Sequence, residues 1–228
     1  MKIRQHRLMA IILFTLPVIT LVNSAVASDI PSTTPTIFAD MEEHAEDIVD
    51  TLLAKDEVAS RSHYQQLSHE MNQLQLLVAT NASDERRYRE LLMAYSWMRV
   101  IDVEITDKSW VEAAIAANQL SGMIIQFTNF PTLKQRDTAW LDYLGREIEL
   151  LTMEGSKANA DLLSVRLFTL EHTWRRVSEE MIKHFSNKPL VLQGNRLVTN
   201  LKETKRPSET IALARQLLDF VDLVEKAK

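Results

Sequence analysis

Apolar residues recur along most of the chain at alternating steps of three and four, a spacing that places them on one face of an α-helix. The first run passes through Met41, Ala45, Ile48 and Leu52 and predicts an opening helix. Six later runs have the same spacing: 64–78, 91–105, 110–127, 141–151, 163–181 and 211–224. Short polar connections separate them, so neighbouring helices should be antiparallel. The pattern predicts an all-α fold, an up-and-down antiparallel bundle of about seven to eight helices.

Segment 190–203 fits two local structures. Leu190, Gly194, Leu197 and Leu201 are in helical register, which would add an eighth helix. The dipeptide Gly194-Asn195 also suits the two-residue turn of a β-hairpin. The helix is the preferred interpretation, and the hairpin stays open.

The chain changes character near residues 129–131. Residues 28–130 contain 17 acidic and 7 basic side chains, whereas residues 131–228 contain 14 and 16. We therefore expect an acidic N-terminal half (37–130) and a C-terminal half (131–228), after a flexible leader (28–36). The helices could form two stacked four-helix units or one larger bundle.

The first 27 residues have the organisation of a secretory signal peptide. Lys2, Arg4 and Arg7 precede an apolar run over 8–22, and small residues follow up to Ala27. A retained membrane anchor is the alternative, but this run is about 15 residues long and a spanning helix needs about 20. The expected product is a soluble periplasmic chain cut after Ala27.

Several function classes are excluded or disfavoured by composition. The chain has no cysteine, which rules out disulfides, a lipoprotein anchor, a thiol nucleophile and covalent c-type haem. Removing the three basic residues of the signal peptide leaves 23 bases against 31 acids, so no nucleic-acid partner is expected. The sequence also lacks a glycine-rich phosphate loop, a G-x-S-x-G elbow, an H-E-x-x-H helix and the Glu-x-x-His pair of di-iron bundles. We expect a protein that is not an enzyme.

One run of residues carries candidate metal chemistry. Asp40, His44 and Asp47 occur at i, i+4 and i+7, so a helix would project them from one face. An imidazole beside carboxylates can bind zinc, copper or nickel. A complete site needs ligands from another helix, and the sequence does not say whether His63 approaches. Acids in a first helical turn also complement the helix dipole, so this run has a plain structural explanation too.

Aromatic side chains suggest a second kind of site. Trp97 and Trp140 lie beside the apolar stripes of their helices, close in sequence to Tyr95 and Tyr143. Together they could line a pocket for a small apolar molecule or a haem-type cofactor.

One acid falls on the inner face of a predicted helix. Asp137 is expected to be buried there, and a partner such as Arg99 or Arg166 would neutralise it. A buried pair that fixes helix register is favoured over a catalytic carboxylate.

These observations lead to three function hypotheses. The first is a non-enzymatic periplasmic binding or accessory factor, for divalent metal ions or for an envelope complex. The second is a bundle that binds a small molecule or a haem-type cofactor through its Trp/Tyr surface. The third is an enzyme of unrecognised type. Metal analysis of the purified protein separates the first two.

Overall fold

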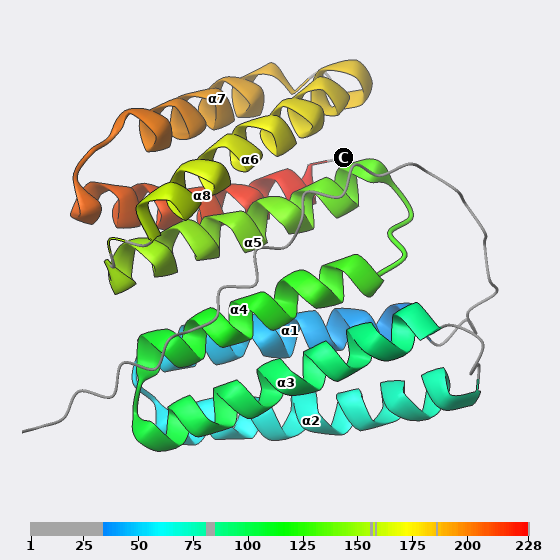
Figure 1. Ribbon diagram of the computed structural model, residues 1–228. Coiled ribbons are helices and arrows are strands. Elements are labelled where there is room, and N and C mark those ends of the chain that lie inside the picture. Colours follow the sequence, from blue (N-terminus) through cyan, green and yellow to red (C-terminus); the bar gives the residue numbers. More distant parts are fainter. Residues whose placement is uncertain (1–33, 81–84, 156, 158, 186, 228) are drawn as a thin grey trace, which may run out of the picture. The chain divides into compact units, whose positions relative to one another are not determined.

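The computed structural model describes residues 34–80, 85–155, 157, 159–185 and 187–227, and the predicted signal peptide lies outside this part (Figure 1). The all-α prediction is confirmed: the described residues form eight α-helices and a short π-helical segment, without a strand. The α-helices are α1 (Thr34–Leu53), α2 (Glu57–Thr80), α3 (Glu85–Asp107), α4 (Trp110–Phe127), α5 (Leu133–Glu154), α6 (Asn159–Glu180), α7 (Lys188–Glu203) and α8 (Pro207–Lys226). Helix α1 begins at Thr34, within the segment expected to be a leader.

The ambiguous segment is helical and forms most of α7. Gly194 lies against the indole of Trp174, and a Cβ at this position would collide with the ring. The next residue completes the contact, because Trp174 Nε1 donates a hydrogen bond to Asn195 Oδ1 at 2.8 Å. The Gly194-Asn195 pair that could have made a hairpin turn therefore serves a close approach between α6 and α7.

The helices pack around two hydrophobic clusters. The first cluster draws on α1–α4, and the second draws on α5–α8. Each also takes one residue from across the border, since Leu150 belongs to the first cluster and Ile125 to the second. The described residues from Thr34 onward form one compact unit, in which α4 of the first group and α5 of the second lie side by side where the two groups meet (Figure 1).

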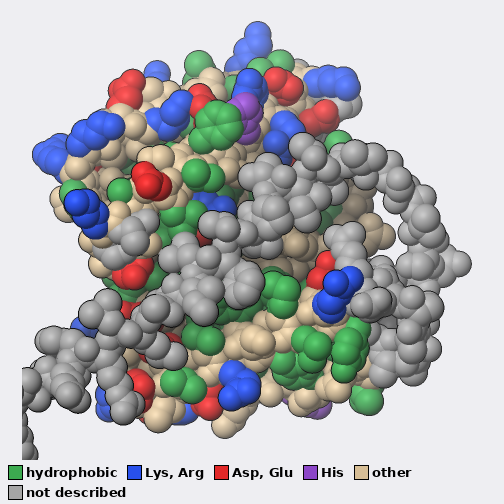
Figure 2. Space-filling view, viewed as in Figure 1, with side chains coloured by type: hydrophobic (Ala, Val, Ile, Leu, Met, Phe, Trp, Pro, Cys, Tyr) green, Lys and Arg blue, Asp and Glu red, His purple; other side chains and the backbone are tan. Residues whose placement is uncertain are grey.

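The charge division follows the two groups of helices. On the face drawn in Figure 2, most lysine and arginine side chains lie over α6 and α7. This agrees with the change from an acidic first half to a nearly balanced second half of the sequence.

A largely buried arginine joins the two groups. Arg146 on α5 is 11% exposed and contacts Asp50 at 2.8 Å, Asp142 at 2.9 Å and Glu46 at 3.3 Å. Burial alone would lower the pKa of Arg146, but the three carboxylates outweigh burial and hold it above its usual value. Burial and the nearby Asp142 raise the pKa of Glu46. These four residues are called the Arg146 cluster below.

Buried acids of the second group of helices pair with arginines. Asp137 lies 2.6 Å from Arg176 and 3.1 Å from Arg136, so the predicted partners Arg99 and Arg166 were wrong. Helix α6 passes directly over α5 and brings Arg176 to Asp137, whereas Arg99 belongs to α3 in the other group.

The remaining predicted partner has a different acid. Arg166 pairs with Glu147 at 2.9 Å, and Arg215 pairs with Glu149 at 2.7 Å. Each of these buried carboxylates therefore has a guanidinium from a neighbouring helix.

Within the described ranges, every helix is too short or too polar to cross a lipid bilayer.

Candidate metal centre

The turn between α1 and α2 sets which side chains face each other across this helix pair. Lys55 adopts a left-handed conformation with φ of 59°, and Asp56 Oδ1 accepts a hydrogen bond from the backbone amide of Ala59 at the start of α2. Ser60 Oγ then donates to Thr51 Oγ1 at 3.0 Å, which locks α2 against α1 one turn from the loop. Continuing this antiparallel register by one more turn brings His63 opposite Asp47.

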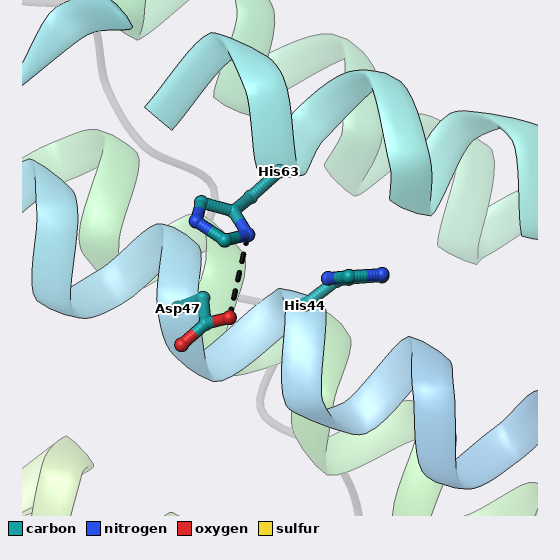
Figure 3. A group of neighbouring side chains, drawn as sticks. All are labelled: His44, Asp47 and His63. Atoms are coloured by element: carbon teal, nitrogen blue, oxygen red, sulfur yellow. Dashed lines mark ion pairs between the residues drawn. The ribbon is translucent and has the colours of Figure 1, made fainter. Parts of the chain in front are cut away.

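Three potential ligands converge there. His44 and Asp47 come from α1 and His63 from α2, and one ligand atom of each lies within 4.8 Å of the others (Figure 3). His63 Nδ1 is 3.3 Å from Asp47 Oδ2, and the rings of His44 and His63 have centroids 5.8 Å apart. Two ligand atoms bound to one tetrahedral Zn²⁺ are about 3.4 Å apart, given bonds of about 2.0–2.1 Å. The His63–Asp47 separation already has this value.

Ring nitrogens in this group lack hydrogen-bond partners. Nδ1 of His44 and Nδ1 of His63 are both buried atoms without a partner among the described residues. For His63 this holds although Asp47 is close, so the contact is an approach of two groups and not an aligned hydrogen bond. Buried polar atoms without partners are uncommon, and an unfilled ligand site is one explanation for them.

A fourth polar residue, Glu70, lies beside Nε2 of His44. Glu70 on α2 places Oε1 3.3 Å from His44 Nε2, and its other oxygen, Oε2, is buried without a partner. Burial raises the pKa of Glu70 to about 7, and the nearby charges of Asp40 and Glu43 add to the effect.

Asp40 lies on the same side of α1 but outside the group. The converging set found in the described residues is His44, Asp47 and His63, while Asp40 is exposed and acts on Glu70 through its charge. Asp40 and Asp47 are seven residues apart, which is about 10 Å along a helix axis. A single ion beside His44 can therefore take one of these acids and not both.

The sequence did not identify His63 or Glu70 as partners. The missing information was the position of the turn. Residues 54–56 reverse the chain, so antiparallel pairing of α1 and α2 places His63 opposite Asp47. The same pairing brings Glu70 within one helical turn of His44. Asp56 as a cap, with Ser60 paired to Thr51, was the local signal that could have supplied it.

The centre borders a surface groove. Its volume is about 430 Å³, and it is lined by His44, Ser62, Gln65, Gln66, His69 and Glu70. The side chain of Asp47 is 42% exposed, so an ion can reach the ligands from solvent. His69 itself contacts Gln73 through its ring nitrogen.

The aromatic residues do not gather into one surface. Trp97 and Tyr95 pack against the first hydrophobic cluster, whereas Trp140 and Tyr143 belong to the second. Trp140 meets Tyr143 edge-on at 5.3 Å, and Tyr143 fills the space beside Gly122. The two aromatic pairs therefore pack into separate hydrophobic clusters.

Comparison with protein-family models, curated proteins and solved structures finds no match to this chain. Functional inference therefore starts from the site itself.

Proposed function

We propose that this protein is an exported, non-enzymatic binding or accessory factor that holds a divalent transition-metal ion between α1 and α2. The observation that carries the proposal is the convergence of His44, Asp47 and His63, with two buried ring nitrogens that have no hydrogen-bond partner. Two imidazoles and one carboxylate form a ligand set that suits Zn²⁺, Cu²⁺ or Ni²⁺ better than Ca²⁺ or Mg²⁺.

The openness of the site favours reversible binding. Three protein ligands leave one tetrahedral position for water or for a ligand from another molecule. Asp47 is partly exposed and a groove runs along the ring of His44, so metal can enter and leave without unfolding. The excess of acidic residues in 28–130 also raises the local concentration of cations. These properties suit a protein that takes up or delivers metal.

Export is the second part of the proposal, and the order of residues in 1–27 supports it. Mass spectrometry of the protein from a periplasmic fraction tests it directly. We expect a chain that begins at Ser28. A full-length chain found in the cytoplasmic fraction would contradict export while leaving metal binding open.

Calorimetric titration with Zn²⁺, Cu²⁺ and Ni²⁺ tests metal binding. We expect a stoichiometry of about one, and His63→Gln should weaken binding by more than about 100-fold, because loss of a direct ligand should exceed the 10–100-fold typical of outer-shell changes. His69→Gln is the matched control, since it removes an exposed histidine of the same helix whose ring contacts Gln73. Absence of heat with all three metals would refute the proposal, as would equal binding by the His63 variant.

A further inference from the structure

The contact between Glu70 and His44 distinguishes the two nitrogens of that imidazole. We propose that Glu70 is a positioning residue: it accepts the Nε2–H of His44 and thereby makes Nδ1 the metal-binding nitrogen. The inference rests on the proposed function. It adds Glu70, which lies outside the converging group, and assigns Nε2 of His44 to Glu70 and Nδ1 to the metal ion.

The geometry separates the two ring nitrogens of His44. Nε2 lies 3.3 Å from Glu70 Oε1, whereas Nδ1 is buried and has no partner. In Figure 3 one ring nitrogen of His44 points toward the space between His63 and Asp47, and the other points away from it. Since Glu70 lies beside Nε2, the nitrogen left for the ion is Nδ1.

Glu70 is placed to hold this arrangement. The side chains of His44 and Glu70 are 19% and 14% exposed, so their contact is shielded from most competing water. A neutral imidazole carries one proton, and the carboxylate draws it to Nε2, which leaves the lone pair on Nδ1. A carboxylate behind a metal-bound histidine also fixes the ring orientation and strengthens it as a ligand.

The alternative role for Glu70 is direct ligation. In that case the ion would sit between Glu70 and His44, bound to Nε2, and it would lie away from His63 and Asp47. If Glu70 positions His44, the metal is bound to Nδ1; if Glu70 is itself a ligand, the metal is bound to Nε2. Identifying the metal-bound nitrogen therefore distinguishes the two roles, and a merely structural role of Glu70 would not determine it.

Histidine ¹⁵N NMR on the zinc-loaded full chain reads the bound nitrogen directly. We expect zinc to shift Nδ1 of His44 and to leave Nε2 protonated. Metallated Nε2 would overturn the inference. This measurement uses the unaltered protein and does not depend on any variant folding.

Zinc titration of three variants tests the energetic role. Glu70→Leu should weaken Zn²⁺ binding by about 10–100-fold, the usual effect of removing such a partner. Glu70→Gln should recover most of the loss, because its amide oxygen still accepts the Nε2–H. Glu43→Gln is the matched control: it removes an exposed acid that acts on Glu70 through charge alone, and binding should stay within about twofold of the unaltered protein.

The outcomes separate the two proposals. Tight zinc binding that Glu70→Leu leaves unchanged would overturn the positioning role and keep the metal centre. Absence of zinc binding by the unaltered protein would overturn both.

Discussion

Helix α1 has two polar faces, and the acidic side chains of each face have a different kind of partner. Toward α5, its carboxylates Glu46 and Asp50 surround Arg146. Toward α2, its side chains His44 and Asp47 meet imidazole and carboxylate groups, and buried ring nitrogens stay unpaired. A guanidinium is a permanent cation with donors only, whereas a neutral imidazole offers a lone pair. In the Arg146 cluster the chain itself supplies the cation. At the group of His44, Asp47 and His63, we propose that the cation comes from solution.

The buried acids of the second group of helices have a different kind of partner from Glu70. Asp137, Glu147 and Glu149 each meet an arginine of a neighbouring helix at 3 Å or less. Glu70 contrasts with them, since its ion-pair contact is with His44. Glu147 Oε2 and Arg166 Nε also lack hydrogen-bond partners, so what distinguishes Glu70 is its imidazole partner, which can also bind a metal ion.

The largest expected effect comes from breaking the Arg146 cluster. Arg146→Met removes the only guanidinium that contacts Glu46, Asp50 and Asp142 among the described residues, and it leaves their charges without compensation. We expect the free energy of unfolding to fall by about 3–5 kcal/mol at pH 7, measured by urea denaturation.

Lys202→Met is the control for that variant. Its pair with Glu171 is exposed by 40% and 41%, so its loss should cost less than about 1 kcal/mol. Equal destabilisation by the two variants would show that burial does not distinguish these ion pairs.

Zinc should stabilise the fold through the other face of α1. At a free Zn²⁺ concentration of about 100 times the dissociation constant, the free energy of unfolding should rise by about 2.7 kcal/mol. A chelator should reverse the gain, and His63→Gln should reduce it to less than about 0.5 kcal/mol. If zinc stabilised the His63 variant equally, the stabilising ion would be bound elsewhere.

Glu42, next to the Arg146 cluster, gives a smaller effect that depends on pH. Burial, with Asp142 and Glu225, raises its pKa from 4.5 to about 7. The folded state therefore holds this proton more tightly than the unfolded state, and stability is lost as the pH rises from about 4.5 through 7.

Glu42→Gln removes this titration. At pH 8 the variant should be more stable than the unaltered protein by about 3 kcal/mol, whereas at pH 4.5 the two should agree within about 0.5 kcal/mol. Urea denaturation at both pH values measures the difference. Arg146, Glu46 and Lys134 also titrate or carry charge near this region, so the comparison is made between variants at each pH. A constant difference at both pH values would contradict the assignment.

The sequence predicted the helices well because their apolar residues follow one period. Met41, Ala45, Ile48 and Leu52, chosen from spacing alone, are all fully buried. Spacing also brought His44 and Asp47 to one side of α1, since that relation depends only on helix geometry.

Relations between helices could not be predicted in the same way. The partner of Asp137 depended on how α6 crosses α5, and the approach of His63 depended on a turn whose left-handed residue is Lys55, not glycine. Gly194 is another example. The sequence does not show that the indole of Trp174 occupies the space beside it, which is why a glycine is needed there.

An anomalous scattering map at the zinc edge, from crystals of the zinc-loaded protein, tests the metal centre between α1 and α2 directly. We expect one main peak, about 2.0–2.2 Å from Nδ1 of His44, a carboxylate oxygen of Asp47 and a ring nitrogen of His63. We expect no peak within the Arg146 cluster, where the guanidinium already provides the positive charge. Zinc bound away from the α1–α2 contact, or no ordered zinc at all, would contradict the proposed metal centre.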